Sequence, residues 1–499
     1  MGNHRRLIRT LSACLLILVA LSGCGALSLR PSDGMAAYRA AMLPQTQAQL
    51  DQVRNAPRYE IDLHIDTDRL TAAGHQAVLY INNQTLDLNE IYFRLYPNLP
   101  SYGGDLQVSR VQVNGREVEA AYEAERTALR VPLSFSLRPG QRVSIALDFR
   151  VTAQRREQNP TLMGEHQGIL TLPSCYPLLA VCQHGAWDTS VGPGFADAVF
   201  SDIGLYQVTL DVPRDAVVVS TGAVLSEAHT PEGRRVIRTV SGPARDFGLV
   251  MSPLFAKQSV SIRGTDVSSY YLPQDEAAGY GVLWRAVAAL QTYSDAFSDY
   301  PYAKFDVVEA PLGKQGMQFP TLILLGSDLY RTDKDQIESL VVRETAHQWW
   351  YNLVGSDPVN EPAVDESLAE FSLYYYFAGV YGPRYADKIA RTRWAEPYEY
   401  AQEHGLDAAV EQPAAAFTPD NYESIIYAKG GALCYELRRY IGPEAFDEAI
   451  RNYVNSYEYR IAPAGAFLGI ASGTTPLSLE EYVAKWREAV PDPDPSAGD

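Results

Sequence analysis

Alternation of apolar and polar residues dominates the first half of the chain. Residues 59–65, 76–81, 107–113 and 142–151 each alternate with a period of two. Such alternation is typical of strands that bury one face, and asparagine-rich turn signals separate the runs. The pattern therefore predicts a β-rich N-terminal domain over residues 58–256.

The spacing of apolar residues becomes helical in the second half of the chain, where they recur every three or four positions. Helices are expected at 275–297, 333–352, 365–381, 384–393, 425–440, 443–457 and 479–489, and strands at 305–310 and 322–325. We therefore expect residues 257–490 to form a second domain, with a short sheet followed by helices. The predicted fold class is α+β, in more than one domain.

Two polar segments flank these domains. Residues 24–57 are rich in alanine and glutamine, and we interpret them as a tether with a short helix within 34–53. Residues 491–499 are rich in proline and aspartate, which predicts a disordered tail.

The N-terminus resembles an export signal. Arg5, Arg6 and Arg9 precede an apolar run at 15–21 that is too short to span a bilayer. The run ends in L-S-G-C, which resembles a bacterial lipobox, so residues 1–23 are expected to be removed and Cys24 to be lipidated. The alternative is an ordinary signal peptide with an incidental cysteine. We predict an extracytoplasmic protein of the cell envelope that contacts the membrane through its lipid anchor only.

Composition and charge narrow the range of partners. Among 499 residues, 46% are hydrophobic and 11% aromatic, which is typical of folded domains. The formal net charge of −18 disfavours binding to nucleic acid, which requires a basic surface. Cys175 and Cys182 form a possible disulfide in an oxidising envelope, while Cys434 lies in an apolar stretch and is expected to be a buried thiol.

Several candidate catalytic and metal-binding residues lie together on the helix predicted over 333–352. Residues 343–347 read R-E-T-A-H. Positions four apart share a helix face, so Arg343 and His347 are expected to point together, with Glu344 beside them. Zinc peptidases use the same spacing in H-E-x-x-H, where two imidazoles bind one ion next to a carboxylate. Here an arginine stands where the first imidazole belongs.

Four segments together resemble the aminopeptidase N family of gluzincin zinc metallopeptidases. They are G-M-Q-F-P at 316–320, R-E-T-A-H-Q-W-W-Y-N at 343–352, Glu366 at 19 positions after His347, and Y-A-K-G at 427–430. The resemblance covers residues 58–480 and implies a thermolysin-like second domain. It also implies zinc-dependent removal of N-terminal residues from peptides, with peptides or protein N-termini as partners and Zn²⁺ as cofactor.

The resemblance assigns a role to each residue of the motif. His347 and Glu366 stand in the second and third metal-ligand positions, and Glu344 stands where the general base activates water. Tyr427 stands where a phenol stabilises the oxyanion. Gly316, Met317 and Gln318 are expected to contact the substrate.

Two departures fall within this predicted site. Arg343 has no lone pair for a metal, and at about 4 Å its charge repels a divalent ion by about 8 kcal/mol at an effective dielectric of about 20. Gln318 replaces the glutamate that grips the substrate amine in the family, a loss of roughly 1–2 kcal/mol. We expect zinc binding to be weak and hydrolysis to be reduced or lost, with the Arg343 guanidinium paired to Glu366 in place of the ion.

Two alternatives remain open from the sequence. The first is a non-catalytic lipoprotein that binds peptides or proteins or acts as a scaffold. The second is an active zinc peptidase in which another residue, His184 or His404, completes the metal site.

Overall fold

A computed structural model of the chain describes residues 34–155, 161–332 and 334–487. Contacts divide the chain into two units, Met1–Ala37 and Tyr38–Asp499, and every element below belongs to the second. The predicted leader, Cys24 and the tail at 491–499 lie outside the described residues. Among the described residues, no helix combines the length and the apolar character that crossing a membrane requires.

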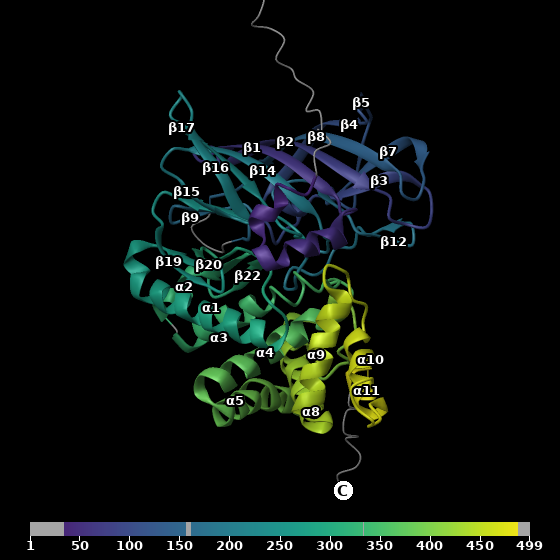
Figure 1. The fold of residues 1–499 in the computed structure, drawn as a ribbon, viewed down its shortest axis with the longest axis vertical. Coiled ribbons are helices and arrows are strands. Elements are labelled where there is room, and N and C mark those ends of the chain that lie inside the picture. Colours follow the sequence, from purple (N-terminus) through teal and green to yellow (C-terminus); the bar gives the residue numbers. More distant parts are fainter. Residues whose placement is uncertain (1–33, 156–160, 333, 488–499) are drawn as a thin grey trace, which may run out of the picture. The chain divides into compact units, whose positions relative to one another are not determined.

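The N-terminal region is built almost entirely from strands (Figure 1). Its largest sheet has the order β16-β17-β14-β1-β2-β8-β4-β5. These strands are β1 (Arg58–Asp66), β2 (Thr71–Ile81), β4 (Asp105–Val113), β5 (Arg116–Glu117), β8 (Arg142–Thr152), β14 (Leu205–Pro213), β16 (Ala223–His229) and β17 (Arg234–Val240). In β1 the side chains from Tyr59 to Ile65 alternate between buried and outward positions, so the predicted period of two is confirmed.

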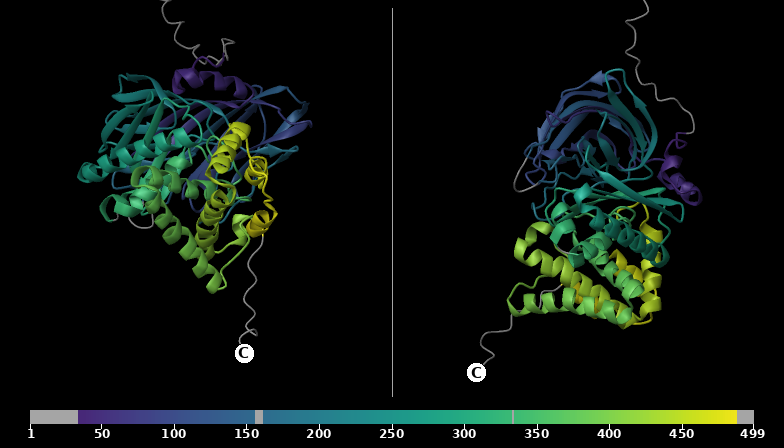
Figure 2. Two further views of the ribbon diagram at one scale, coloured as in Figure 1. Left: turned by 60° about the horizontal axis from the view of Figure 1, so that its bottom comes forward. Right: turned by 90° about the vertical axis from the view of Figure 1, so that its left-hand side faces the viewer.

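Smaller sheets complete this region, in the orders β15-β18-β10-β9, β11-β3-β7-β6 and β12-β13. Their strands are β3 (Leu88–Arg94), β6 (Ala121–Glu123), β7 (Ala128–Leu137), β9 (Gly164–His166), β10 (Ile169–Thr171), β11 (Leu178–Leu179), β12 (Cys182–Gln183), β13 (Ala186–Trp187), β15 (Val217–Ser220) and β18 (Leu249–Ser252). The large sheet and the smaller ones share one apolar core, around which Figure 2 shows them curving.

The second region starts with a five-stranded sheet of order β19-β20-β21-β23-β22. Its strands are β19 (Ala256–Ile262), β20 (Thr265–Tyr271), β21 (Lys304–Ala310), β22 (Gly316–Phe319) and β23 (Leu322–Gly326). The predicted boundary at 256–257 falls at the start of β19. In Figures 1 and 2 this sheet lies between the β-rich region and the helices, and β22 is an edge strand.

Helices follow along the rest of the chain. They are α1 (Glu276–Ala296), α2 (Ser327–Thr332), α3 (Lys334–Ala346), α4 (Ala363–Tyr381), α5 (Pro383–Ile389), the π-helix η5 (Ala390–Ala395), α6 (Glu396–Glu403), α7 (Pro419–Tyr422), the π-helix η7 (Glu423–Lys429), α8 (Gly430–Ile441), α9 (Pro443–Tyr457), α10 (Ala466–Ser472) and α11 (Glu480–Arg487). Two predicted helices thus contain π-helical segments, which occur often at functional sites.

One predicted helix is shorter than expected. The helix predicted over 333–352 ends at Ala346, and the chain then turns so that Trp349 and Trp350 are buried. The backbone N–H and the side-chain amide of Asn352 both donate to the carbonyl of His347, at 3.2 and 2.9 Å, which satisfies this acceptor where the helix stops. His347 therefore sits at the C-terminal end of α3 rather than in its middle.

Residues 38–53, within the segment predicted as a tether, form part of the second unit. The 3₁₀ helices η1 (Tyr38–Ala41) and η2 (Pro44–Val53) cover this stretch. Thr46 donates through its hydroxyl to the carbonyl of Pro301 at 2.7 Å, and Leu50 is buried. The tether prediction is therefore wrong for residues 38–53, because sequence polarity did not reveal the few apolar side chains that anchor them.

The possible disulfide is absent from the structure. Cys175, Cys182 and Cys434 are free thiols among the described residues. The chain between Cys175 and Cys182 includes the extended pair β11, and Cys182 itself begins β12. Cys434 is buried, as predicted.

Candidate active site

Three elements of the second region bring the predicted motif residues together. β22 carries Met317 and Gln318, α3 carries Arg343 and Glu344, and α4 carries Glu366 near its start. The strand approaches the helix closely at Gly316, where a Cβ atom would lie 2.8 Å from Cγ of Glu344. Glycine is therefore required at this position for β22 to reach the site.

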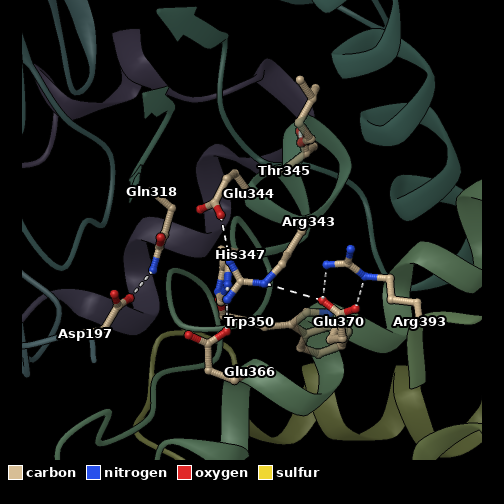
Figure 3. A network of polar contacts seen from close by, with 11 residues as sticks. Asp197, Gln318, Arg343, Glu344, Thr345, His347, Trp350, Glu366, Glu370 and Arg393 are labelled. Carbon is tan, nitrogen blue, oxygen red and sulfur yellow. Dashed lines mark hydrogen bonds and ion pairs between the residues drawn. The ribbon is translucent and has the colours of Figure 1, made fainter. Parts of the chain in front are cut away.

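Arg343 lies at the centre of a buried network of carboxylates (Figure 3). Its Nη1 donates to Oε1 of Glu344 at 2.8 Å, and its Nη2 donates to Oε2 of Glu366. Its Nε lies 3.7 Å from Oε2 of Glu370. The predicted pairing of Arg343 with Glu366 is thus present, and the guanidinium joins three carboxylates.

Attraction between the opposite charges in this network counteracts the cost of burying the ionised side chains. Burial opposes ionisation of Glu366, but the guanidinium of Arg343 and the His347 ring outweigh it and lower the pKa of Glu366 to about 2. Burial likewise disfavours the charge of Arg343, yet Glu366 and the other carboxylates hold its pKa well above the usual value. Burial raises the pKa of Glu344, although Arg343 and His347 limit the shift.

His347 is buried and oriented from both ring nitrogens. Its Nδ1 donates to the carbonyl of Trp350 at 3.1 Å, and its Nε2 lies 3.4 Å from Oε2 of Glu366, an ion-pair distance without the alignment of a hydrogen bond. Burial would lower the pKa of His347, but the adjacent Glu366 carboxylate raises it to about 9. The imidazole is therefore cationic at neutral pH.

The family resemblance implies zinc, which in a catalytic site takes three protein ligands in a tetrahedral arrangement. The separation of His347 Nε2 and Glu366 Oε2, 3.4 Å, is about that of two ligands of a tetrahedral zinc ion. However, the Glu366 oxygen that faces His347 is the one that Arg343 Nη2 contacts. A guanidinium cannot donate an electron pair and carries a like charge, so the residues present do not fit a three-ligand zinc site.

No other side chain completes the set. Across residues 34–155, 161–332 and 334–487, no group of three or more His, Cys, Asp and Glu side chains is arranged to hold a metal ion. His404 is exposed at the end of α6, where its ring stacks on Tyr400. His184 is exposed in the turn between β12 and β13. Neither lines the cleft, which argues against the substitute-ligand alternative.

Beyond Arg343 lies a second arginine. Arg393, in the π-helix η5, donates to both oxygens of Glu370, with its Nη2 at 3.1 Å from Oε2. Trp394 Nε1 donates to the same carboxylate at 2.9 Å. Burial opposes ionisation of Glu370, but Arg393 and then Arg343 outweigh it and lower its pKa. Glu370 thus links the two arginines.

On the opposite side of the network, Gln318 contacts an aspartate from the β-rich region (Figure 3). Its side-chain amide donates to Oδ2 of Asp197 at 2.7 Å. Burial and the negative charge of Glu366 raise the pKa of Asp197. The carboxylate that the sequence lacks at position 318 is therefore supplied next to it, by a residue 121 positions earlier.

Contacts between the two regions fix the loop that carries Asp197. The hydroxyl of Tyr351 donates to the carbonyl of Val199 at 2.5 Å. Arg245 is fully buried, donates through Nη1 to the carbonyl of Ser201 at 2.9 Å, and donates through Nε to the carbonyl of Tyr351. Tyr351 lies in the turn that comes after the motif helix, five positions beyond Ala346, so the loop is anchored close to the end of that helix.

These residues line a cleft with a volume of about 530 Å³. Tyr427, in the π-helix η7, lies over the guanidinium of Arg343, whose Cζ is 4.6 Å from the ring centroid. The ring of Tyr422 packs between those of Tyr427 and Phe195. The cleft is therefore open above a site that has an arginine at its centre.

Sequence reasoning placed six of these residues but missed others. Gly316, Met317, Gln318, Arg343, Glu366 and Tyr427 all line the cleft, and Glu344 and His347 lie beneath it. The catalytic roles assigned to Glu344 and Tyr427 remain predictions. Asp197 and Arg393 were missed, because Asp197 lies in a loop without a motif and Arg393 in an ordinary polar helix pattern. The neutral Gln318 was the one signal that another acid was needed.

Comparison with known proteins agrees with this geometry. Residues 283–486 match the family model described as Peptidase family M1 domain. Puromycin-sensitive aminopeptidase of Caenorhabditis elegans is 23% identical over 399 residues, which is 75% of this chain and 40% of that protein. Aminopeptidase M1-B of Oryza sativa subsp. japonica is 24% identical over 309 residues, 56% of this chain and 34% of that protein. The chain thus spans less than half the length of these two relatives.

Solved structures share the fold over nearly their whole length. The M1 zinc metallopeptidase from Deinococcus radiodurans has a TM-score of 0.65 at 18% identity, with 87% of this chain and 94% of that one covered. A mutant of it bound to a Tyr-Ser-Ala substrate has a TM-score of 0.66 at 17% identity, with coverage of 88% and 96%. Motif, domain match and fold agree: residues 283–486 match the Peptidase family M1 domain, and the chain is similar in fold to an M1 zinc metallopeptidase.

Proposed function

We propose that this protein is an extracytoplasmic, lipid-anchored member of the family that binds peptides by their free N-termini without hydrolysing them. One observation carries the proposal: the Arg343 guanidinium occupies the metal side of the site and pairs with both Glu344 and Glu366. A permanent cation there replaces the charge of an ion but not its ability to bind water.

Loss of hydrolysis follows from the same contacts. Glu344, the residue in the general-base position, is held 2.8 Å from a guanidinium that hydrogen-bonds one of its oxygens. A base in this position must instead face a water molecule within hydrogen-bond reach of the scissile bond. The ion pair stabilises the ionised carboxylate and weakens it as a base.

Peptide binding is supported by what the cleft retains. The cavity of about 530 Å³ lies in the size range of small-ligand sites. Asp197, oriented by Gln318, offers a carboxylate to an ammonium group, which restores the charge-assisted contact that Gln318 alone lacks. The Deinococcus radiodurans enzyme of similar fold, in complex with Tyr-Ser-Ala, is a precedent for a peptide in such a cleft.

Metal content and turnover test the proposal. Full-length protein exposed to excess zinc and then freed of unbound metal should retain well under one zinc per chain and should not cleave aminoacyl reporter substrates. Arg343→His should raise bound zinc to nearly one per chain, because three ligands are then available. The matched control Arg263→His, at an arginine outside the cleft that is paired with the single carboxylate of Asp295, should leave zinc content unchanged. Wild-type protein with one zinc and clear turnover would refute the proposal.

The anchor is tested separately. Its support is the L-S-G-C sequence that ends at Cys24. Cys24→Ala should move the protein from the membrane fraction to the soluble fraction, or leave the leader unprocessed. A variant that stays in the membrane with a normally trimmed N-terminus would rule out lipidation at Cys24.

A further inference from the structure

A cationic side chain, that of Arg393, lies on the side of the cleft opposite Asp197. Arg393 lines the cleft, and its side chain is 39% exposed. Its Nε and Nη2 are used on Glu370, while Nη1 makes no hydrogen bond to the part of the chain that the structure describes. A guanidinium has five N–H groups, so Arg393 retains donors for a ligand.

Glu370 holds this arginine in place. The carboxylate is buried and accepts hydrogen bonds from Arg393 and Trp394, with Arg343 at 3.7 Å. A guanidinium fixed by a bidentate pair loses little further side-chain entropy when it binds a ligand. Arg393 is therefore a preorganised anion site.

The guanidinium at the centre of the cleft is less accessible, since the Arg343 side chain is only 12% exposed. Arg343 is committed to Glu344 and Glu366, and the ring of Tyr427 covers its guanidinium. Figure 3 shows Asp197 and Arg393 on opposite sides of this neutralised centre. A ligand therefore meets the carboxylate of Asp197 on one side of the cleft and the guanidinium of Arg393 on the other.

We infer that the cleft selects short peptides with both termini free, with the ammonium group at Asp197 and the carboxylate at Arg393. This inference rests on the proposed function and names its ligand class. Asp197 and Arg393 line the same cleft, and an extended tripeptide spans on the order of 10 Å. Each terminus would gain a charge-assisted hydrogen bond, and longer peptides could satisfy only one end.

Binding of trialanine and its end-blocked forms tests the inference by calorimetry on the full-length protein. N-acetyl-trialanine and trialanine amide should each bind the wild type about tenfold more weakly than trialanine, or worse, the loss expected for one charge-assisted contact. Across alanine peptides of two to six residues, affinity should peak at one short length and fall beyond it.

Variants assign each preference to its residue. Asp197→Asn should abolish the preference for the free amine only, and Arg393→Gln the preference for the free carboxylate only. Arg393→Lys should keep the carboxylate preference, since it retains a charge at that end. A merely structural role for Arg393 would weaken all three peptides alike and leave their ratios unchanged, which would overturn the inference.

Two wild-type results separate this inference from the proposed function, even if a variant fails to fold. If trialanine amide binds as tightly as trialanine while the acetylated form does not bind, the inference fails and the proposed function stands. If affinity stays constant across alanine peptides of three to six residues, the inference likewise fails and the proposed function stands. If the acetylated form also binds equally well, recognition of N-termini fails too.

Discussion

Glu366 in the cleft and Glu309 on β21 are both buried glutamates beside an arginine, yet their pKa values shift in opposite directions. The pKa of Glu366 is lowered to about 2, whereas burial and the nearby Asp275 raise that of Glu309 to about 7. Burial opposes ionisation at both positions. The difference lies in the number of cations that each carboxylate contacts.

Glu366 contacts two cations, Arg343 and His347, which outweigh its burial. At the other cluster, Arg331 is committed to Asp275 at 2.9 Å and reaches Glu309 only at 3.5 Å. Glu309 therefore relies on the backbone N–H of Leu272 at 2.8 Å, which does not offset its burial. Of these two buried carboxylates, only the one with a dedicated cation has a lowered pKa, and that cation is Arg343.

Removing the guanidinium of Arg343 should have the largest effect on the stability of the fold. Arg343→Met leaves Glu344, Glu366 and Glu370 without their shared partner, and we expect a loss of about 3–5 kcal/mol in the free energy of unfolding. Urea denaturation of full-length protein at neutral pH measures the change.

Arg331→Met is the matched comparison, and it should cost clearly less. Arg331 is more exposed than Arg343, and Glu309 is already half protonated at neutral pH. Equal losses for the two variants would show that the guanidinium of Arg343 is not the dedicated counterion that the contacts indicate.

A smaller effect should appear in the pH dependence of stability. The folded-state pKa of Glu309, about 7, lies above its usual value of 4.5. Its contribution to stability is therefore fully present below about pH 4.5 and is lost as the pH rises through 7. Glu309→Gln should remove that loss, so the variant should gain stability relative to wild type between pH 4.5 and 8. Thermal unfolding across this range measures it.

Glu117→Gln, at an exposed carboxylate, is the control for this experiment. It should track the wild-type curve throughout. A Glu309→Gln curve parallel to wild type would mean that Glu309 ionises in the folded protein as readily as in the unfolded chain.

The smallest effect is expected from Tyr427→Phe. The ring over Arg343 remains, so the cation–π contact is retained and stability should change by less than about 1 kcal/mol. The proposed function involves no hydrolysis and so no oxyanion for the hydroxyl to stabilise, and on that proposal trialanine affinity should also be unchanged. A large loss of peptide affinity would assign the hydroxyl a direct role in binding.

Local patterns in the sequence were sufficient for much of the fold. The period of two in β1 and the helical spacing of α1 and α4 were predicted to within two residues of their bounds, because both follow from which side chains must be buried. The early end of α3 and the π-helical turns at Arg393 and Tyr427 were not predicted, because they depend on packing against distant elements.

The sequence, through its resemblance to the family, predicted that an arginine stands where a metal ligand is expected and that it pairs with Glu366. The opposite charges of the two side chains favour that pairing once the two helices pack together. Only the tertiary structure decided which charges flank that centre. Asp197 reaches Gln318 from a loop of the β-rich region, anchored by Tyr351, and Arg393 reaches Glu370 from a π-helical turn. Such long-range neighbours depend on how separately folded elements pack, which no local pattern of residues encodes.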